Sequence, residues 1–150
     1  MFLIITALIV IIDQVTKYLA YIYLQPQNTV PVINNFFYLT YFQGTETAAN
    51  ILSDKRMVLN GRFASLIILI VVLFIAIYVC RSTIININFK IGITLVISGV
   101  ISNLIDKIRS GYVVYFIDFD IYPVFNFADF AVILGFFYIL FIVFLETKNV

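Results

Sequence analysis

The sequence has no histidine, one cysteine and few charged residues, which make up 11% of its 150 positions. An average soluble domain carries about 25%. Without histidine, histidine-based catalysis and histidine-bound metals are excluded, and the single Cys80 excludes an intrachain disulfide and a zinc site of Cys and His ligands. Nine basic and eight acidic residues give a net charge of +1, so no basic field is present to hold nucleic acid. We therefore expect no metal, no other cofactor and no nucleic-acid partner.

Hydrophobic residues dominate instead. They make up 63% of the chain, and the mean hydropathy is +1.10, which excludes both a soluble globular domain and a disordered chain. A helix needs about 20 predominantly apolar residues to cross a bilayer. Four stretches meet this requirement, at about 2–24, 63–80, 89–105 and 128–145. They predict an all-α membrane protein with four transmembrane helices in a single membrane domain, residues 1–150.

The polar residues gather in two long loops, 25–62 and 106–127, separated by a short loop between the second and third spans. In the first loop, 30–33 and 36–42 are rich in β-branched and aromatic residues, which predicts short strands and a small strand-containing subdomain. Four spans place both long loops on one side of the membrane and both termini on the other. A plain count of Lys and Arg would put the long loops in the cytoplasm, but long loops count less in this rule, so the charges alone do not decide the orientation.

Ionisable side chains inside a membrane span are functional candidates, because a charge at the bilayer centre costs about 3 kcal/mol or more. Asp13 and Lys17 are four residues apart in the first span, so they share a helix face and can pair. A purely structural ion pair near a helix end is the alternative. Asn103 and Asp106 share a face at the end of the third span, where an ordinary helix end at the headgroups is the alternative.

Further carboxylates lie near the start of the fourth span. Asp129 follows Asn126 by three residues, and either side chain can cap the helix. From its position alone, Asp129 can therefore be either a helix cap or a catalytic residue. Asp118 and Asp120 precede them, with solvated loop carboxylates as the alternative. With no histidine, no thiol nucleophile and no metal cluster, paired carboxylates remain. Two that lie close together share one proton, so that one acts as a base on water and the other as an acid on a substrate carbonyl, as in aspartic proteases.

The order of motifs resembles the lipoprotein signal peptidases (signal peptidase II). The family's first helix carries Asp-Gln-x-x-Lys, matched by Asp13-Gln14-Val15-Thr16-Lys17. Its third helix ends in Gly-Asn-x-x-Asp-Arg, where this chain has Ser102-Asn103-Leu104-Ile105-Asp106-Lys107. A family segment Val-Val-Asp-Phe then falls on Val113-Val114-Tyr115-Phe116, and Phe-Asn-x-Ala-Asp falls on Phe125-Asn126-Phe127-Ala128-Asp129. The resemblance covers essentially the whole chain.

This resemblance implies an aspartic endopeptidase of the bacterial cytoplasmic (inner) membrane that cleaves lipid-modified prolipoproteins just before the lipidated Cys. The long loops are then extracytoplasmic and both termini cytoplasmic. The implied partners are the prolipoprotein substrate and membrane lipids, and we expect a monomer. Asp129 takes the position of one catalytic Asp of the family. The residues that would order the site are Asp13, Lys17, Asn103, Asp106 and Asn126.

Several positions depart from the family pattern. Tyr115 occupies the other catalytic Asp position, and a phenol, with an ordinary pKa of about 10, can donate a hydrogen bond but is a poor general base at neutral pH. Lys107 replaces the motif's Arg and cannot form the same bidentate contacts. The family's loop motif Asn-x-Gly-x-Ala-Phe falls on residues 44–49, where only Ala48 matches. Residues 44–49, beginning with Gly44, are expected to contact substrate.

Three readings of the site stay open. In the first, the enzyme is active with a relocated partner for Asp129. Asp118 is the tentative partner, and a bulge or helical turn would be needed to bring it to the Tyr115 side of an extended segment. In the second, a divergent relative binds lipidated peptides or lipids without cleaving, and Tyr115 fills the partner's place. In the third, a small membrane protein handles ions or lipids along a path of Asp13, Asp106 and Asp129.

Overall fold

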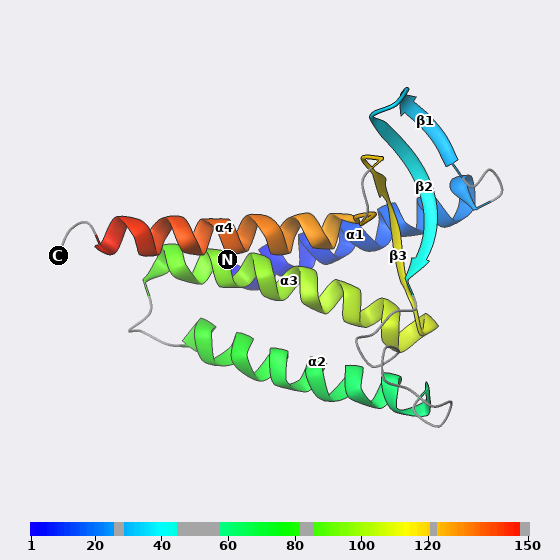
Figure 1. Cartoon of the computed structure of the whole chain (residues 1–150). Coiled ribbons are helices and arrows are strands. Elements are labelled where there is room, and N and C mark those ends of the chain that lie inside the picture. Colours follow the sequence, from blue (N-terminus) through cyan, green and yellow to red (C-terminus); the bar gives the residue numbers. More distant parts are fainter. Residues whose placement is uncertain (26–28, 45–57, 82–85, 121–122, 148–150) are drawn as a thin grey trace.

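The computed structural model describes residues 1–25, 29–44, 58–81, 86–120 and 123–147. Long helices lie side by side, and a small sheet packs at one end of them (Figure 1). The start of α1 and the end of α4 lie away from the sheet. In chain order the elements are α1 (Phe2–Leu24), β1 (Thr29–Ile33), β2 (Phe37–Gly44), α2 (Val58–Arg81), α3 (Ile87–Ser110), β3 (Val113–Asp118) and α4 (Phe127–Thr147).

Helix α3 is central and packs against α1, α2 and α4. Its contact with α4 depends on glycines, because a Cβ on Gly135 of α4 would lie 2.7 Å from the Gly92 carbonyl oxygen. A Cβ on Gly99 would overlap the carbonyl oxygen of Ala128 at the start of α4. Small residues let membrane helices approach this closely. The position of α4's first turn is therefore fixed by the backbone of α3.

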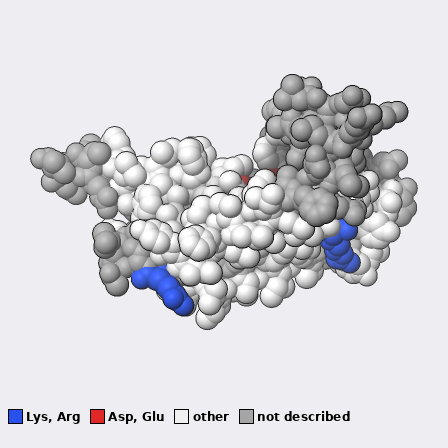
Figure 2. Space-filling model, turned by 90° about the horizontal axis from the view of Figure 1, so that it is seen from below, with Lys and Arg blue, Asp and Glu red and all other residues white. Residues whose placement is uncertain are grey.

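The helical body is apolar on its outside. Three described helices are long and apolar enough to cross a membrane, Phe2–Leu24, Ile87–Ser110 and Phe127–Leu145, as predicted for the first, third and fourth spans. The predicted second span lies in α2, where the apolar helix identified among the described residues, Leu66–Val79, is shorter. Figure 2 shows a face on which Lys and Arg occur only towards its two ends. Three of the four predicted spans are thus supported, and the second span, in α2, stays a prediction.

The sheet is antiparallel in the order β1-β2-β3. Tyr38 pairs with Asp118, and the register shifts between Leu39 and Phe42, so β2 contains a bulge opposite β3. The sheet is attached to the end of α1 by a buried hydrophobic cluster consisting of Ala20, Leu24, Phe116 and Ile117. The two strands predicted in the first loop are present, and β3 adds a strand within the segment predicted as the second loop.

Two helices extend beyond the predicted spans. Helix α3 continues to Ser110, so Asp106 and Lys107 are helical rather than the start of a loop. It ends at Gly111, whose φ of 85° is left-handed and whose N–H donates to the Lys107 carbonyl at 3.0 Å. Helix α2 begins at Val58, within the predicted loop 25–62. Hydropathy marks where the apolar run stops, whereas the helix stops where a glycine cap is available.

Candidate active site

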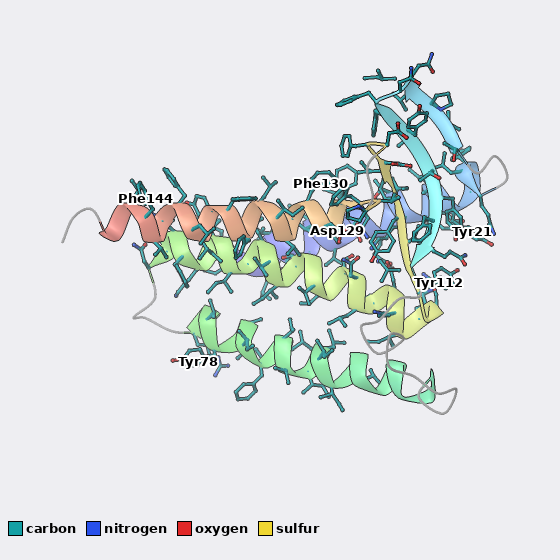
Figure 3. All side chains as sticks on the ribbon, in the orientation of Figure 1. Tyr21, Tyr78, Tyr112, Asp129, Phe130 and Phe144 are labelled. Atoms are coloured by element: carbon teal, nitrogen blue, oxygen red, sulfur yellow. The ribbon has the colours of Figure 1, made fainter. Side chains whose placement is uncertain are left out.

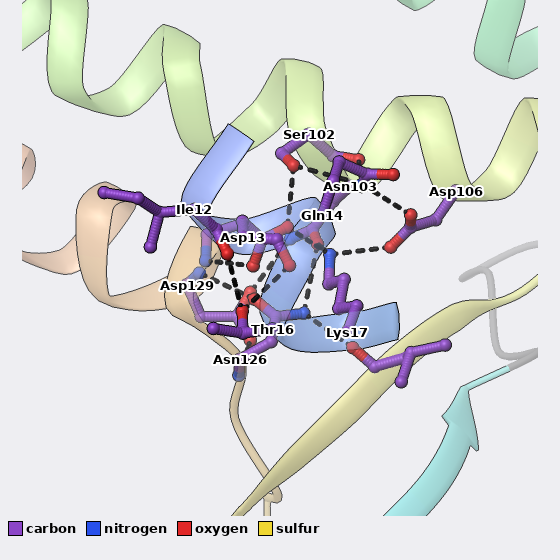
Figure 4. A network of polar contacts seen from close by, with 12 residues as sticks. Ile12, Asp13, Gln14, Thr16, Lys17, Ser102, Asn103, Asp106, Asn126 and Asp129 are labelled. Carbon is purple, nitrogen blue, oxygen red and sulfur yellow. Dashed lines mark hydrogen bonds and ion pairs between the residues drawn. The ribbon is translucent and has the colours of Figure 1, made fainter. Parts of the chain in front are cut away.

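Asp13 connects three helices at the centre of a buried polar network (Figure 4). Its side chain is completely buried. Oδ2 accepts a hydrogen bond from Ser102 Oγ of α3 at 2.6 Å, and Oδ1 accepts the backbone N–H of Ala128 of α4 at 2.8 Å. An isolated carboxylate at this depth would be costly, so these donors are what make its burial tolerable. Asp13 therefore fixes α1 against both α3 and the start of α4.

Lys17 is only 4% exposed, and its ammonium lies close to three oxygen atoms. Nζ lies 2.6 Å from Asp13 Oδ2 and 2.6 Å from Asp106 Oδ2, and donates to Asn103 Oδ1 at 2.8 Å. The pairing expected from the four-residue spacing is present, and it is joined by two groups from α3. Gln14 Nε2 donates to Asp106 Oδ1 at 2.7 Å. One ammonium thus sits between two carboxylates.

Asn126 and Asp129 cap the start of α4 together. Asn126 Oδ1 accepts the backbone N–H of Asp129 at 2.9 Å, and Asp129 Oδ2 accepts the backbone N–H of Asn126 at 3.0 Å, which is a reciprocal capping box. The other oxygen, Asp129 Oδ1, accepts from Asn103 Nδ2 at 3.0 Å. Asn126 Nδ2 donates to Asn103 Oδ1 and to the Val114 carbonyl, each at 3.1 Å. The Asp129 carboxylate is held by α3, and its cap is tied to β3.

A cleft of about 440 Å³ opens beside this carboxylate. In Figure 3 Asp129 lies at the start of α4 next to β3. Tyr115 and Asp129 are the ionisable side chains among the described residues that line the cleft, and the rest of the lining is apolar or glycine. The lining residues are Phe42, Gly44, Tyr115, Pro123, Val124, Phe125, Asp129, Val132 and Ile133. The cleft combines one carboxylate, one phenol and walls suited to hydrocarbon.

Gly44 leaves the space that the Tyr115 ring occupies. A Cβ at position 44 would overlap Cε2 of that ring. The Tyr115 and Phe42 rings lie 6.2 Å apart between centroids, at 48°. The two strands pair here, with Phe42 opposite Tyr115 and Gly44 opposite Val113. A large aromatic side chain is thus accommodated at the position where the family motif has Asp.

A second cleft, of about 320 Å³, lies on the other side of the polar network. Val114 lines it, whereas the next residue, Tyr115, lines the first cleft, as expected for successive residues of a strand. Burial raises the pKa of the Tyr41 phenol in its wall above the usual value, although Gln43 Nε2 donates to it at 3.0 Å. The lining residues are Gln14, Lys17, Tyr18, Tyr21, Tyr41, Asp106, Arg109, Ser110, Tyr112 and Val114.

The structure brings together most of the predicted site residues but not all of them. The Asp118 carboxylate accepts the Asp120 N–H at 2.9 Å and is not among the described residues that line the Asp129 cleft. Lys107 lies in the last turn of α3 and is not among the residues labelled in Figure 4. Gly44 lines the cleft, and the rest of the loop motif, 45–49, lies outside the described residues.

Sequence reasoning gave no role to Gln14 or Ser102, although both contact the buried carboxylates. Gln14 lies inside the Asp-Gln-x-x-Lys motif, which was the available signal. Ser102 directly precedes Asn103 but stands where the motif has Gly, so the motif gave no reason to select it. The cleft's apolar walls come from β2, α4 and the segment before α4, and only the fold brings these together.

Comparisons with known proteins agree with this architecture. Residues 5–145 match the family described as signal peptidase (SPase) II. A lipoprotein signal peptidase from Caldanaerobacter subterraneus subsp. tengcongensis is 39% identical over 136 residues, covering 90% of each chain. One from Clostridioides difficile is 32% identical and covers 99% of each chain.

Solved structures give the same result. One, described as a bacterial membrane enzyme structure by the in meso method at 2.3 Å resolution, has a TM-score of 0.81 and 30% identity, and the match covers 99% of this chain and 90% of that one. A second, at 1.9 Å, has a TM-score of 0.79 and 30% identity, covering 95% and 91%. The family match spans all four helices and the sheet, and the chain belongs to the signal peptidase II family.

Proposed function

We propose that the protein is a membrane aspartic endopeptidase that cleaves lipid-modified prolipoproteins before the lipidated Cys. The observation that carries the proposal is the Asp129 carboxylate in an apolar cleft, held on one oxygen by Asn103 and on the other by the Asn126 N–H. A positioned carboxylate can activate water, and the surrounding apolar walls suit acyl chains. Membership of the signal peptidase II family supports the reaction class.

The proposed setting is the bacterial cytoplasmic membrane. All four helices would cross it in one domain, α2 together with the three helices already supported as spans. Helix α2 runs alongside α3 and packs against it (Figure 1). The sheet and the Asp129 cleft lie at the end of the helices away from the termini, which supports an extracytoplasmic site and cytoplasmic termini. A monomer suffices for this arrangement, with prolipoprotein and membrane lipids as partners.

The network would orient the catalytic carboxylate. Lys17 donates to Asn103 Oδ1, and the amide nitrogen of Asn103 donates to Asp129 Oδ1. The buried ammonium thus fixes which way the Asn103 amide faces. Asp13 and Asp106 in turn hold the ammonium in place. In this scheme Asp129 acts on water, and the other network residues position it.

A second candidate function is favoured by one observation. Tyr115 shares the cleft with Asp129, and the described lining contains no second carboxylate. A protein with this site can bind a lipidated peptide without cleaving it. It would then sequester prolipoproteins or regulate a cleaving relative.

The deciding experiment is a cleavage assay on a lipid-modified prolipoprotein, with the full chain in detergent. We expect the native chain to cleave, Asp129→Asn to be inactive, and the matched control Asp120→Asn, at an exposed carboxylate, to behave as the native chain. If the native chain binds substrate without cleaving and Tyr115→Asp gains cleavage, the second candidate is correct. If Asp129→Asn cleaves at the native rate, Asp129 is not the catalytic carboxylate.

A further inference from the structure

Hydrolysis of a peptide bond needs two functions at the carbonyl: a base for the attacking water and a donor for the oxygen that becomes negative. The described lining of the cleft supplies one ionisable group for each, the Asp129 carboxylate and the Tyr115 phenol. We propose that Tyr115 is the catalytic hydrogen-bond donor to the scissile carbonyl oxygen, with Asp129 as the base. This inference rests on the proposed endopeptidase function and assigns the group that acts opposite Asp129.

The backbone positions that carry the two groups are tied together. The carbonyl of Val114, next to Tyr115 in β3, accepts Asn126 Nδ2 at 3.1 Å. The backbone N–H of the same Asn126 donates to Asp129 Oδ2 at 3.0 Å. One asparagine therefore links the strand bearing the phenol to the helix turn bearing the carboxylate. A donor whose position is fixed in advance needs no rearrangement when negative charge develops on the carbonyl oxygen.

The phenol is also held from the other side. Its ring lies over Gly44, where a Cβ would overlap it, and beside the ring of Phe42. These neighbours belong to β2, which pairs with β3 at this point. Tyr115 is therefore packed into the wall of the cleft. Its ring is placed by strand pairing, which restricts the rotamers open to it.

The proposed reaction balances without a second carboxylate. Asp129 takes a proton from water while the water oxygen bonds to the carbonyl carbon. The carbonyl oxygen becomes negative and accepts a hydrogen bond from the Tyr115 O–H, which keeps its proton. The C–N bond then breaks, and Asp129 passes its proton to the departing nitrogen. One water is consumed, and a carboxylate and an amine are formed.

This assignment changes the expected pH dependence. Two carboxylates that share a proton give a bell-shaped profile, because the active form carries one proton on the pair. A phenol keeps its proton up to about pH 10, so below that pH it can donate whenever Asp129 is ionised. The rate of the native chain should rise once, as the Asp129 carboxyl loses its proton, and then stay level through neutral pH.

The test compares the native chain with Tyr115→Phe in proteoliposomes containing a lipid-modified prolipoprotein. The matched control is Tyr78→Phe, an exposed tyrosine on α2 (Figure 3). We expect Tyr115→Phe to lower kcat by about 100- to 1,000-fold with little change in KM, as for loss of one oxyanion donor. Tyr78→Phe should leave both constants unchanged. The profile of Tyr115→Asp should become bell-shaped.

Three outcomes would overturn the inference, and they differ in what they say of the proposed function. If Tyr115→Phe keeps the native kcat while Asp129→Asn is inactive, the donor role is wrong and the endopeptidase function stands. A native profile that falls again in the acidic range would show a second carboxylate at work and also exclude the donor role. If the native chain binds substrate but cleaves none, the endopeptidase function itself fails and the donor role fails with it.

Discussion

At the scale of single residues, Lys17 decides whether the buried network is stable. Its ammonium contacts two carboxylates and one amide oxygen and is almost fully buried. Removing one partner of a buried ion pair leaves an uncompensated charge, which costs more than the pair itself contributes. The network therefore depends on Lys17 more than on any of its individual hydrogen bonds.

The substitution Lys17→Met tests this dependence. We expect the free energy of unfolding in detergent to fall by about 3–5 kcal/mol, because Asp13 and Asp106 lose their common counter-ion. The double variant with Asp106→Asn should lose less than the sum of the two single variants, since it removes one of the stranded charges. Lys107→Met, in the last turn of α3, is the matched control. Additive losses in the double variant would show that the ion pair is not coupled.

The sequence predicts part of this network and leaves out the rest. The four-residue spacing of Asp13 and Lys17 lies within one helix, so helical geometry alone places both on one face. The contacts of Lys17 with Asn103 and Asp106 join residues 86 and 89 positions apart in the chain. Which helix faces meet is decided by packing, and local spacing holds no information about it.

At the scale of elements, the contact of α3 with α4 sets where Asp129 lies. Gly99 meets the Ala128 carbonyl directly, one residue before Asp129. Apolar length predicted where these helices run, but it did not predict how closely they approach. Strand β3 was also not predicted, because its six residues lie within a longer aromatic and acidic segment that reads equally well as a loop.

The substitution Gly99→Ala tests the role of this contact. The added methyl meets the backbone of α4, which cannot turn away as a flexible side chain can. We expect the free energy of unfolding to fall by about 1–3 kcal/mol and cleavage to fall further, because the first turn of α4 must shift and carry Asp129 with it. Ser110→Ala, at the exposed end of α3, is the control. If Gly99→Ala is destabilised but keeps native activity, the close contact of α3 with α4 does not set the position of Asp129.

At the scale of the whole molecule, the arrangement of spans determines on which side of the membrane the site lies. The structure supports three spans, in α1, α3 and α4. The side of the membrane on which each loop lies depends on whether α2 crosses as well. If α2 crosses, the β1–β2 turn and the segment after β3 share one side, and the end of α2 lies on the other. If α2 does not cross, the β1–β2 turn and the end of α2 lie on the same side.

Labelling of single cysteines decides between these topologies. In a Cys80→Ser background, Asn34→Cys, Arg81→Cys and Asp120→Cys each place one thiol at an exposed position. We expect a membrane-impermeant maleimide to label positions 34 and 120 in spheroplasts, and position 81 only after the membrane is permeabilised. Cleavage of prolipoprotein by each variant in detergent is the control for folding. Equal labelling of positions 34 and 81 in intact spheroplasts would mean that α2 lies on one side of the membrane. That result would contradict the structure, because β2 and β3, which pair in one sheet, would then lie on opposite sides of the membrane.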